Sequence, residues 1–452
     1  MKSTSSKILS GFKKPFSRGN EVTSINLFIR GLTLGGKFFF IIFLGKHLTD
    51  AQMGEWGIFT TSISLSLYLV GLDFYTYSTR TILDYPIEDR KPFLRDQFVF
   101  YLISYALLFP LLYLLFAFKV MEPKLAIFFY IVLLFEHLAQ EAYRTFVLFK
   151  RPIAANVILF LRTGLWSYVL LTTWFLHFDE LKSFKSTLVF WICGGASAVI
   201  TAIILLSRIH FKSVKGIPVD WGWIRKGIKV SLVYFIATIS FKIIEMADRY
   251  FLAYYHSKDM VGIYTFYASM ANMIEIFVHT TTIIIFSPIL IDTFHKNNIE
   301  YQSAINRFAK SILIYNIFAV IILAAIMYPV LEFVINKKSY LVHLSSFILL
   351  VAAEMVFNVS LIFHYILYVR KNDFAVVKAT ILTAFTNILL NFILIPDLGI
   401  NGAALATFLS FIMLVILKAY YTRNLYEGRK IISLRFLRKS KKNQHRSEHL
   451  NN

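Results

Sequence analysis

The chain has 452 residues, 57% of them hydrophobic and only 16% charged, and its mean hydropathy is +0.62. A soluble chain carries about 25% charged residues, so this composition excludes a soluble globular protein. The net charge of +21 lies mainly in loops and tails between apolar runs. That placement argues against nucleic acid as a partner and indicates positive-inside membrane topology. The single cysteine, Cys193, excludes an intrachain disulfide and a thiolate metal cluster.

Apolar runs of about 20 residues, the length that crosses the hydrocarbon core, recur along the whole chain. They predict an all-α polytopic membrane protein with about twelve transmembrane helices. The predicted spans cover residues 22–46, 56–79, 93–118, 123–147, 152–177, 186–208, 224–253, 260–290, 303–335, 340–369, 373–396 and 399–423.

The basic connection between the sixth and seventh spans is the natural division of the chain. We expect two six-helix bundles with a linker between them and a basic tail at each end. The predicted parts are a cytoplasmic N-terminal tail over 1–21, a first bundle over 22–210, a cytoplasmic linker over 211–223, a second bundle over 224–423 and a polybasic cytoplasmic tail over 424–452.

The two halves are weakly similar to each other. With an offset of 205 residues, the segment 56–60 aligns with 261–265, and Lys37 aligns with Lys242. Such self-similarity is typical of transporters, and six helices in each half predict a pseudo-twofold axis along the membrane normal, with a substrate path between the halves. Most of the 47 Lys and Arg residues fall on one side of the predicted membrane, which predicts that both termini are cytoplasmic.

The first span carries a polar stripe. At 100° per residue, Asn26, Arg30, Thr33 and Lys37 fall within roughly 60° of one helix face. A cation at the centre of a lipid-facing helix costs about 2.5–3.5 kcal/mol, so such residues normally face a bundle interior or a water-filled cavity. The stripe predicts a cavity lined by cations.

The seventh span repeats this stripe with variation: Ser231, Thr238, Lys242, Glu245 and Arg249 share one face. Two interpretations stay open. The stripe either forms a cation-rich cavity wall or is internally paired, because Glu245 can reach both Lys242 and Arg249 along the helix.

Arg162 lies four residues before Trp166 in the fifth span, which offers a cation and an aromatic ring to a sugar phosphate. Packing of the arginine stem on the indole ring is the alternative interpretation. The candidate substrate-binding cations are therefore Arg30, Lys37, Arg162, Lys242 and Arg249.

Asp73, Glu245 and Glu275 are candidates for ion coupling, since a carboxylate inside a membrane span can carry H⁺ or Na⁺. Neutralisation of a nearby Lys or Arg is the other interpretation. Asp73 is expected to share a helix face with Ser66, Thr76 and Arg80. We find no metal-binding motif, P-loop or nucleophile elbow, so we expect no catalytic residues, no enzymatic activity and no cofactor beyond a coupling ion.

Three stretches carry a family resemblance: 387–407, which includes Pro396, Gly399 and Gly402; 248–264 with Pro288; and 53–80, which includes Gly54, Gly57 and Gly71. Together they resemble the polysaccharide-export flippases of the multidrug/oligosaccharidyl-lipid/polysaccharide exporter superfamily.

The resemblance implies a flippase in the cytoplasmic (inner) membrane that moves undecaprenyl-pyrophosphate-linked oligosaccharides, such as O-antigen, capsule or exopolysaccharide repeat units, to the outer leaflet by alternating access. It also implies contacts with membrane lipids and with polysaccharide polymerase machinery. The buried cations suit a pyrophosphate. Three alternatives remain: a drug/cation antiporter of the same fold, a peptidoglycan-precursor flippase, which usually has two further helices, and a membrane-embedded polymerase or glycosyltransferase, which usually has a large outer loop.

Overall fold

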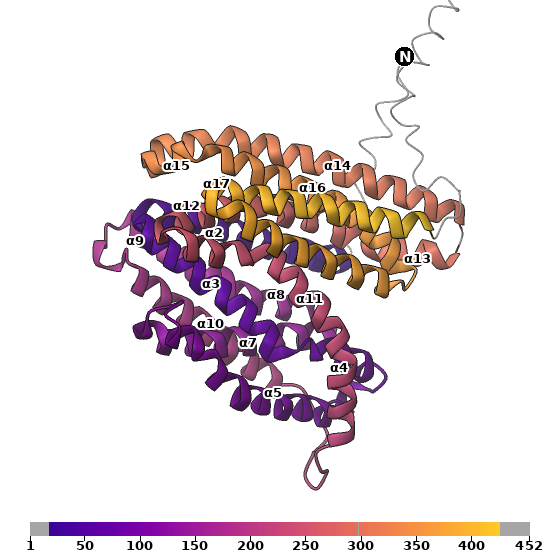
Figure 1. Ribbon diagram of the computed structural model, residues 1–452. Helices are drawn as coiled ribbons and strands as arrows, with labels where there is room; N and C mark the ends of the chain where they lie inside the picture. The colour runs from indigo at the N-terminus through magenta and orange to yellow at the C-terminus, as the bar shows by residue number, and fades with distance from the viewer. Residues whose placement is uncertain (1–17, 297, 425–452) are drawn as a thin grey trace, which may run out of the picture. The chain divides into compact units, whose positions relative to one another are not determined.

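The computed structural model describes residues 18–296 and 298–424, and these form helices joined by short connections (Figure 1). The α-helices are α2 (Arg18–His47), α3 (Asp50–Gly71), α4 (Phe74–Ile82), α5 (Lys91–Leu112), α6 (Leu114–Ala117), α7 (Ala126–Leu148), α8 (Pro152–Phe160), α9 (Trp166–Phe175), α10 (Phe184–Ser207), α11 (Trp221–Tyr255), α12 (Lys258–Val278), α13 (Ile284–Lys296), α14 (Asn298–Pro329), α15 (Lys338–Val342), α16 (Leu344–Val369) and α17 (Asp373–Asn424).

Shorter helical segments of two kinds connect them. Within residues 18–296 and 298–424, three of them are 3₁₀-helices: η2 (Ile87–Asp89), η3 (Pro123–Leu125) and η5 (Asp179–Leu181). Three are π-helices that continue or join longer helices: η4 (Leu161–Leu165), η6 (His279–Ile283) and η7 (Val330–Ile335).

The helices confirm a multi-pass membrane protein. Within the described residues, ten helical segments are long and apolar enough to cross a membrane, and α3 with α4 makes an eleventh that is bent by 48°. The segment α17 is divided by Gly399, whose φ of 54° lies outside the helical region. Pro396, three residues earlier, removes a backbone donor at the same place. The kink at Gly399 separates two helices within α17 at the place where the eleventh and twelfth spans are predicted to meet.

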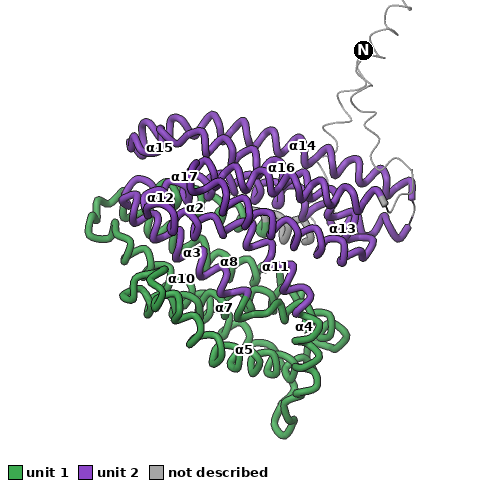
Figure 2. The backbone as a smooth tube through the Cα atoms, in the orientation of Figure 1, with its two compact units in different colours: residues 1–43, 69–231 green, residues 44–68, 232–452 purple. Residues whose placement is uncertain are grey.

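The packing of the helices divides the chain into two compact units (Figure 2). Unit 1 holds residues up to 43 and 69–231, and unit 2 holds 44–68 and 232–452. The sequence places 44–68 in the first bundle, whereas the structure groups this segment with the second unit. The predicted linker at 211–223 and the pseudo-twofold axis stay predictions.

Close backbone contact explains why α3 is grouped with unit 2. A Cβ atom on Gly54 would overlap the Lys258 carbonyl oxygen, and one on Gly57 would overlap the Thr265 side chain of α12. Small residues let two helix backbones approach this closely. At the start of α3, Asp50 accepts hydrogen bonds from Ser339 at 2.7 Å and from Lys337 at 3.3 Å. Unit 2 is completed by α12, α14 and α17, which all pack against α16.

Unit 1 is organised around α7, which packs against α8 and α10. Its buried apolar side chains include Ala139 and Phe146 of α7, Ile158 of α8 and Ala198 of α10. These side chains come from three helices, and burial of their apolar surface holds the helices together.

The second span is broken beside Asp73. Leu72 and Asp73 adopt left-handed φ values of 45° and 49°, so α3 ends at Gly71 and α4 begins at Phe74. Asp73 is buried at this break. The predicted face of Ser66, Asp73, Thr76 and Arg80 is therefore interrupted, because Ser66 lies on α3, before the break, whereas Thr76 and Arg80 lie on α4, after it.

Two predicted segments fall mainly on residues outside the described part of the chain. They are the basic tail over 1–21, of which the structure describes only the backbone of 18–21, and the polybasic tail beyond Asn424. The cytoplasmic location of both termini stays a prediction.

Candidate functional site

The polar stripe of α2 lies against other helices of unit 1. Arg30 Nε donates a hydrogen bond to Asn156 Oδ1 of α8 at 3.2 Å, and its Nη2 donates to the Tyr143 hydroxyl of α7 at 3.4 Å. The Asn156 side chain in turn donates to Asn26 Oδ1 at 2.7 Å. The part of the stripe that is predicted to lie nearer the cytoplasm therefore forms hydrogen bonds within unit 1, and the partners of Arg30 are uncharged.

Lys37 lies two turns further along α2, near an ion pair between α7 and η4. Arg162 Nε of η4 donates to Glu136 Oε2 of α7 at 2.5 Å. Lys37 is close enough to Glu136 and Arg162 for their charges to interact. Among the residues that the structure describes, the half-buried Lys37 ammonium has no hydrogen-bond partner, and the Arg162 side chain donates only through Nε.

The π-helix η4 brings this cluster together. A π-helical turn inserts one residue into an α-helix, and such turns are frequent at functional sites. Gly164, within η4, lets the fifth span approach α2: a Cβ atom at this position would lie 3.4 Å from the Thr33 Cα atom and 2.7 Å from the Phe160 ring. Thr33 is one turn before Lys37 on α2, so the close approach places η4 beside the lysine.

Glu136 also holds an aromatic ring. Its second carboxylate oxygen, Oε1, accepts the indole N–H of Trp191 from α10 at 2.6 Å. The Trp191 ring stacks on Trp166, with centroids 6.1 Å apart and planes 13° apart. Trp166 is buried, and its own N–H donates to the Arg162 backbone oxygen at 2.9 Å. Trp191 is therefore the ring bonded to the Glu136 carboxylate, whereas the predicted ring, Trp166, bonds to the Arg162 backbone and stacks on Trp191.

The cluster of Lys37, Glu136 and Arg162 has a surplus of positive charge. Two cations and one carboxylate give a formal charge of +1. Like charges repel strongly in a medium of low dielectric constant, and Glu136 balances only one of the two cations. The unused N–H donors of Lys37 and Arg162 therefore suit an oxyanion.

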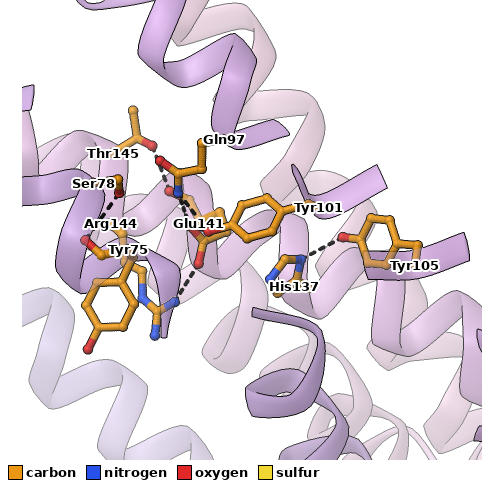
Figure 3. Close-up of polar contacts among 9 residues, drawn as sticks. All are labelled: Tyr75, Ser78, Gln97, Tyr101, Tyr105, His137, Glu141, Arg144 and Thr145. Carbon is orange, nitrogen blue, oxygen red and sulfur yellow. Dashed lines mark hydrogen bonds and ion pairs between the residues drawn. The ribbon is translucent and has the colours of Figure 1, made fainter. Parts of the chain in front are cut away.

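A second buried network lies on α7, centred on Glu141 (Figure 3). Glu141 Oε2 accepts hydrogen bonds from Tyr101 at 2.7 Å and Gln97 at 2.9 Å, and Oε1 accepts from Arg144 at 2.5 Å. The Arg144 guanidinium lies 3.5 Å from the centre of the Tyr75 ring of α4. Because these partners come from α4, α5 and α7, the network fastens three helices together.

His137, beside this network, has a different partner. Its Nδ1 atom lies 2.6 Å from the Tyr105 hydroxyl of α5, and Figure 3 shows the two rings on the far side of Tyr101 from Arg144. The His137 side chain is only 1% exposed. No group of three His, Cys, Asp or Glu residues that would suit a metal ion occurs among the described residues.

The cations of the α11 stripe are paired. Lys242 Nζ lies 2.5 Å from Glu245 Oε2 on the same helix. Arg249 pairs with its neighbour Asp248 at 3.2 Å and donates to the Glu245 backbone oxygen at 2.9 Å. Asp248 also accepts a hydrogen bond from Tyr264 of α12. Lys242 is therefore paired with Glu245, as one of the two interpretations of the stripe expects. Arg249 is also paired, but its carboxylate partner is Asp248 rather than Glu245.

A cavity of about 330 Å³ lies within unit 2, between α11, α12 and α16. Asn272 donates to Glu275 Oε2 at 2.7 Å, and Glu354 of α16 is close enough to Glu275 and Glu245 for their charges to interact. The ionisable groups that line the cavity include four carboxyl groups and two cations: Glu245, Asp248, Glu275, Glu354, Lys242 and Arg249. This acidic surplus suits a cation. Asp73, the third predicted coupling acid, belongs to unit 1.

The chain matches no family model and no curated protein. It does match solved structures. The lipid II flippase MurJ in an inward closed conformation aligns with a TM-score of 0.68 at 15% identity, over 89% of this chain and 87% of that one. An inward-facing multidrug resistance MATE family transporter of the MOP superfamily aligns with a TM-score of 0.68 at 12% identity, over 88% and 94%. The chain has the fold of the MOP transporters.

A third match, a MATE protein in complex with MaD3S, aligns with a TM-score of 0.58 at 11% identity, over 89% of this chain and 93% of that one. The shared architecture confirms the predicted fold class. At these identities the likeness concerns the fold, so the residues of the site must be interpreted from their own contacts.

Four residues of the Lys37 cluster and of the unit 2 cavity are not among the site residues predicted from the sequence: Glu136, Trp191, Asp248 and Glu354. Glu136 and Glu354 are carboxylates within predicted membrane spans, and such residues indicate function or pairing. Their partners are on other helices, more than twenty residues away, so no short-range spacing could connect Glu136 with Arg162 or Glu354 with Glu275.

Proposed function

We propose that the protein is a flippase that moves undecaprenyl-pyrophosphate-linked oligosaccharide repeat units from the cytoplasmic to the outer leaflet of the cytoplasmic membrane. The observation that carries this proposal is the uncompensated positive charge at Lys37 and Arg162 of unit 1. A lipid-linked pyrophosphate is an anion attached to an apolar chain, and its phosphate oxygens match the N–H donors of these side chains. Trp191, joined to the same cluster, is a stacking surface for a sugar ring.

The fold supports the same proposal. One solved structure with this architecture is described as a lipid II flippase. Alternating access, in which one part of a transporter rocks against another around a central site, is the mechanism we propose by analogy with transporters built from repeats. The lipid tail would remain in the bilayer while the charged headgroup crosses through the protein.

The acidic cavity of unit 2 supports a second element of the proposal, ion coupling. Glu245, Glu275 and Glu354 offer carboxylate oxygens in a partly buried space, and H⁺ or Na⁺ would bind there and supply the driving force. This feature also favours an alternative function, an antiporter for cationic drugs. Other solved structures with this fold include a multidrug resistance transporter.

Deletion of the gene and analysis of lipid-linked intermediates tests the proposal. We expect complete repeat units to accumulate on the cytoplasmic face of the membrane and Lys37→Ala to fail to complement the deletion. Incomplete glycans would instead indicate a glycosyltransferase. A wild-type set of intermediates, together with increased sensitivity of the deletion strain to cationic dyes, would indicate the antiporter.

A further inference from the structure

Glu136 occupies an unusual place for a carboxylate within a site that would bind anions. It is 4% exposed and bonds through one oxygen to Arg162 and through the other to Trp191. The two oxygens thereby fix the orientation of a guanidinium and an indole ring that come from different helices. Glu136 is also the carboxylate that interacts with the Lys37 ammonium.

From this geometry we infer that Glu136 is a resident counter-ion, a positioning residue that orients Arg162 and also limits the affinity for the anionic headgroup. The inference rests on the proposed function. A phosphate bound by Lys37 and by the unused nitrogens of Arg162 lies near the Glu136 carboxylate, because the carboxylate holds the Nε atom of the same guanidinium. The two anions repel each other, and in a site of low dielectric constant this repulsion is substantial.

The repulsion has a functional consequence. A flippase must release its substrate. Two unopposed cations would bind the headgroup equally tightly before and during its movement, and such uniform binding does not raise the turnover rate. Glu136 reduces the attraction between the site and the headgroup. Because the repulsion acts on each negative charge, it weakens binding of a diphosphate more than binding of a monophosphate.

The network around Glu141, on the same helix, provides a comparison in which one carboxylate pairs with one arginine. Glu141 is bonded to Arg144, Tyr101 and Gln97, and the charge of its one arginine is fully matched. Glu136, by contrast, faces two cations and has only one of them in an ion pair. The surplus cation beside Glu136 distinguishes it from Glu141, whose negative charge is matched by one arginine.

Binding of radiolabelled undecaprenyl diphosphate and undecaprenyl monophosphate to the purified full-length protein tests the inference. We expect Glu136→Gln to bind the diphosphate about tenfold more tightly than the wild-type protein, with a smaller gain for the monophosphate. Lys37→Ala should bind both lipids about tenfold more weakly. Glu180→Gln removes the same charge from an exposed position in unit 1 and should leave both affinities unchanged.

Transport in proteoliposomes gives a second measurement, in which a purely structural role for Glu136 predicts no joint decrease of KM and kcat. Tighter binding with slower release lowers both KM and kcat, so we expect Glu136→Gln to show the two constants falling together. A higher KM in this variant, or weaker binding of the diphosphate, would overturn the inference and leave Glu136 as a residue that only orients Arg162.

A glutamine at position 136 places its amide N–H₂ against either the Arg162 or the Trp191 donor. Two donors that face each other repel, and this repulsion destabilises the variant. Glu136→Gln/Trp191→Phe removes the Trp191 donor and leaves the glutamine oxygen for Arg162. This double variant should bind the diphosphate more tightly than Trp191→Phe alone. Equal or weaker binding would contradict the inference. If Lys37→Ala binds as well as the wild-type protein, or the wild-type protein binds neither lipid, the proposed function fails as well.

Discussion

Lys242 and Glu245 are joined by an ion pair of 2.5 Å along a single turn of α11. Lys37, which aligns with Lys242 when the two halves of the sequence are compared, has no such partner on its own helix. The residues one turn away from Lys37 are Thr33, Leu34, Phe40 and Ile41. Two lysines that are equivalent by sequence position therefore have different electrostatic surroundings, and the predicted effects of replacing them differ.

Replacement of Lys242 should affect stability first. Lys242→Met leaves the Glu245 carboxylate in a partly buried place without its cation, and we expect a loss of about 1–3 kcal/mol in the free energy of unfolding. Thermal unfolding of the purified protein in detergent measures this as a lower Tm. The double substitution Lys242→Met/Glu245→Gln removes the unpaired charge and should recover part of the loss. An unchanged Tm in the single variant would contradict the pairing.

Replacement of Lys37 should affect transport first. Because Lys37 has no hydrogen-bond partner in the described part of the chain, Lys37→Ala leaves no carboxylate without a hydrogen bond, and its Tm should equal that of the wild-type protein. Flipping of the lipid-linked substrate in proteoliposomes should fall about tenfold or more, since a charge-assisted contact to phosphate is lost. Lys37→Arg restores the cation and should recover much of the activity. Wild-type transport by Lys37→Ala would remove the cationic site from the mechanism.

Glu354 tests the role of the unit 2 cavity. It is near Glu275 and Glu245, so a bound H⁺ or Na⁺ would relieve the repulsion among the three carboxylates. We expect Glu354→Gln to make transport insensitive to the imposed H⁺ or Na⁺ gradient. Glu332→Gln, on η7, is the matched control within unit 2, because Glu332 is exposed and does not line the cavity. Gradient-driven transport that is equal in Glu354→Gln and the wild-type protein would exclude this residue from coupling.

The contact between α3 and α12 gives a steric prediction. In Gly54→Ala the new methyl group meets the Lys258 carbonyl oxygen, which is backbone and has no rotamer that would relieve the overlap. Forced overpacking of this kind costs about 1–3 kcal/mol, so expression and Tm should both fall. Gly31→Ala, on α2, is the control. A Cβ atom there has no heavy atom within 4 Å, and alanine favours a helix more than glycine does. A Tm that is equal in both variants would refute the close packing.

The amino-acid sequence was sufficient to establish the class of the protein and the positions of its spans. Length and apolarity of a span are local properties, so the runs that end near Pro396 and restart at Gly399, for example, could be identified without tertiary information. The ion pair between Lys242 and Glu245 on α11 could also be predicted from the sequence, because these residues are three positions apart and residues at this spacing meet on a helix.

Which cations are balanced depends on how the helices pack. The carboxylate near Lys37 is Glu136, about one hundred positions further along the chain, and the second cation is Arg162, on another helix again. No helical period connects residues at such separations. Their meeting depends on the close approach of α2 to η4 at Gly164 and on the packing of α7 against α8. Electrostatic interactions depend on distance in space, which is why the sequence could propose a cationic stripe but could not distinguish an unbalanced lysine from a paired one.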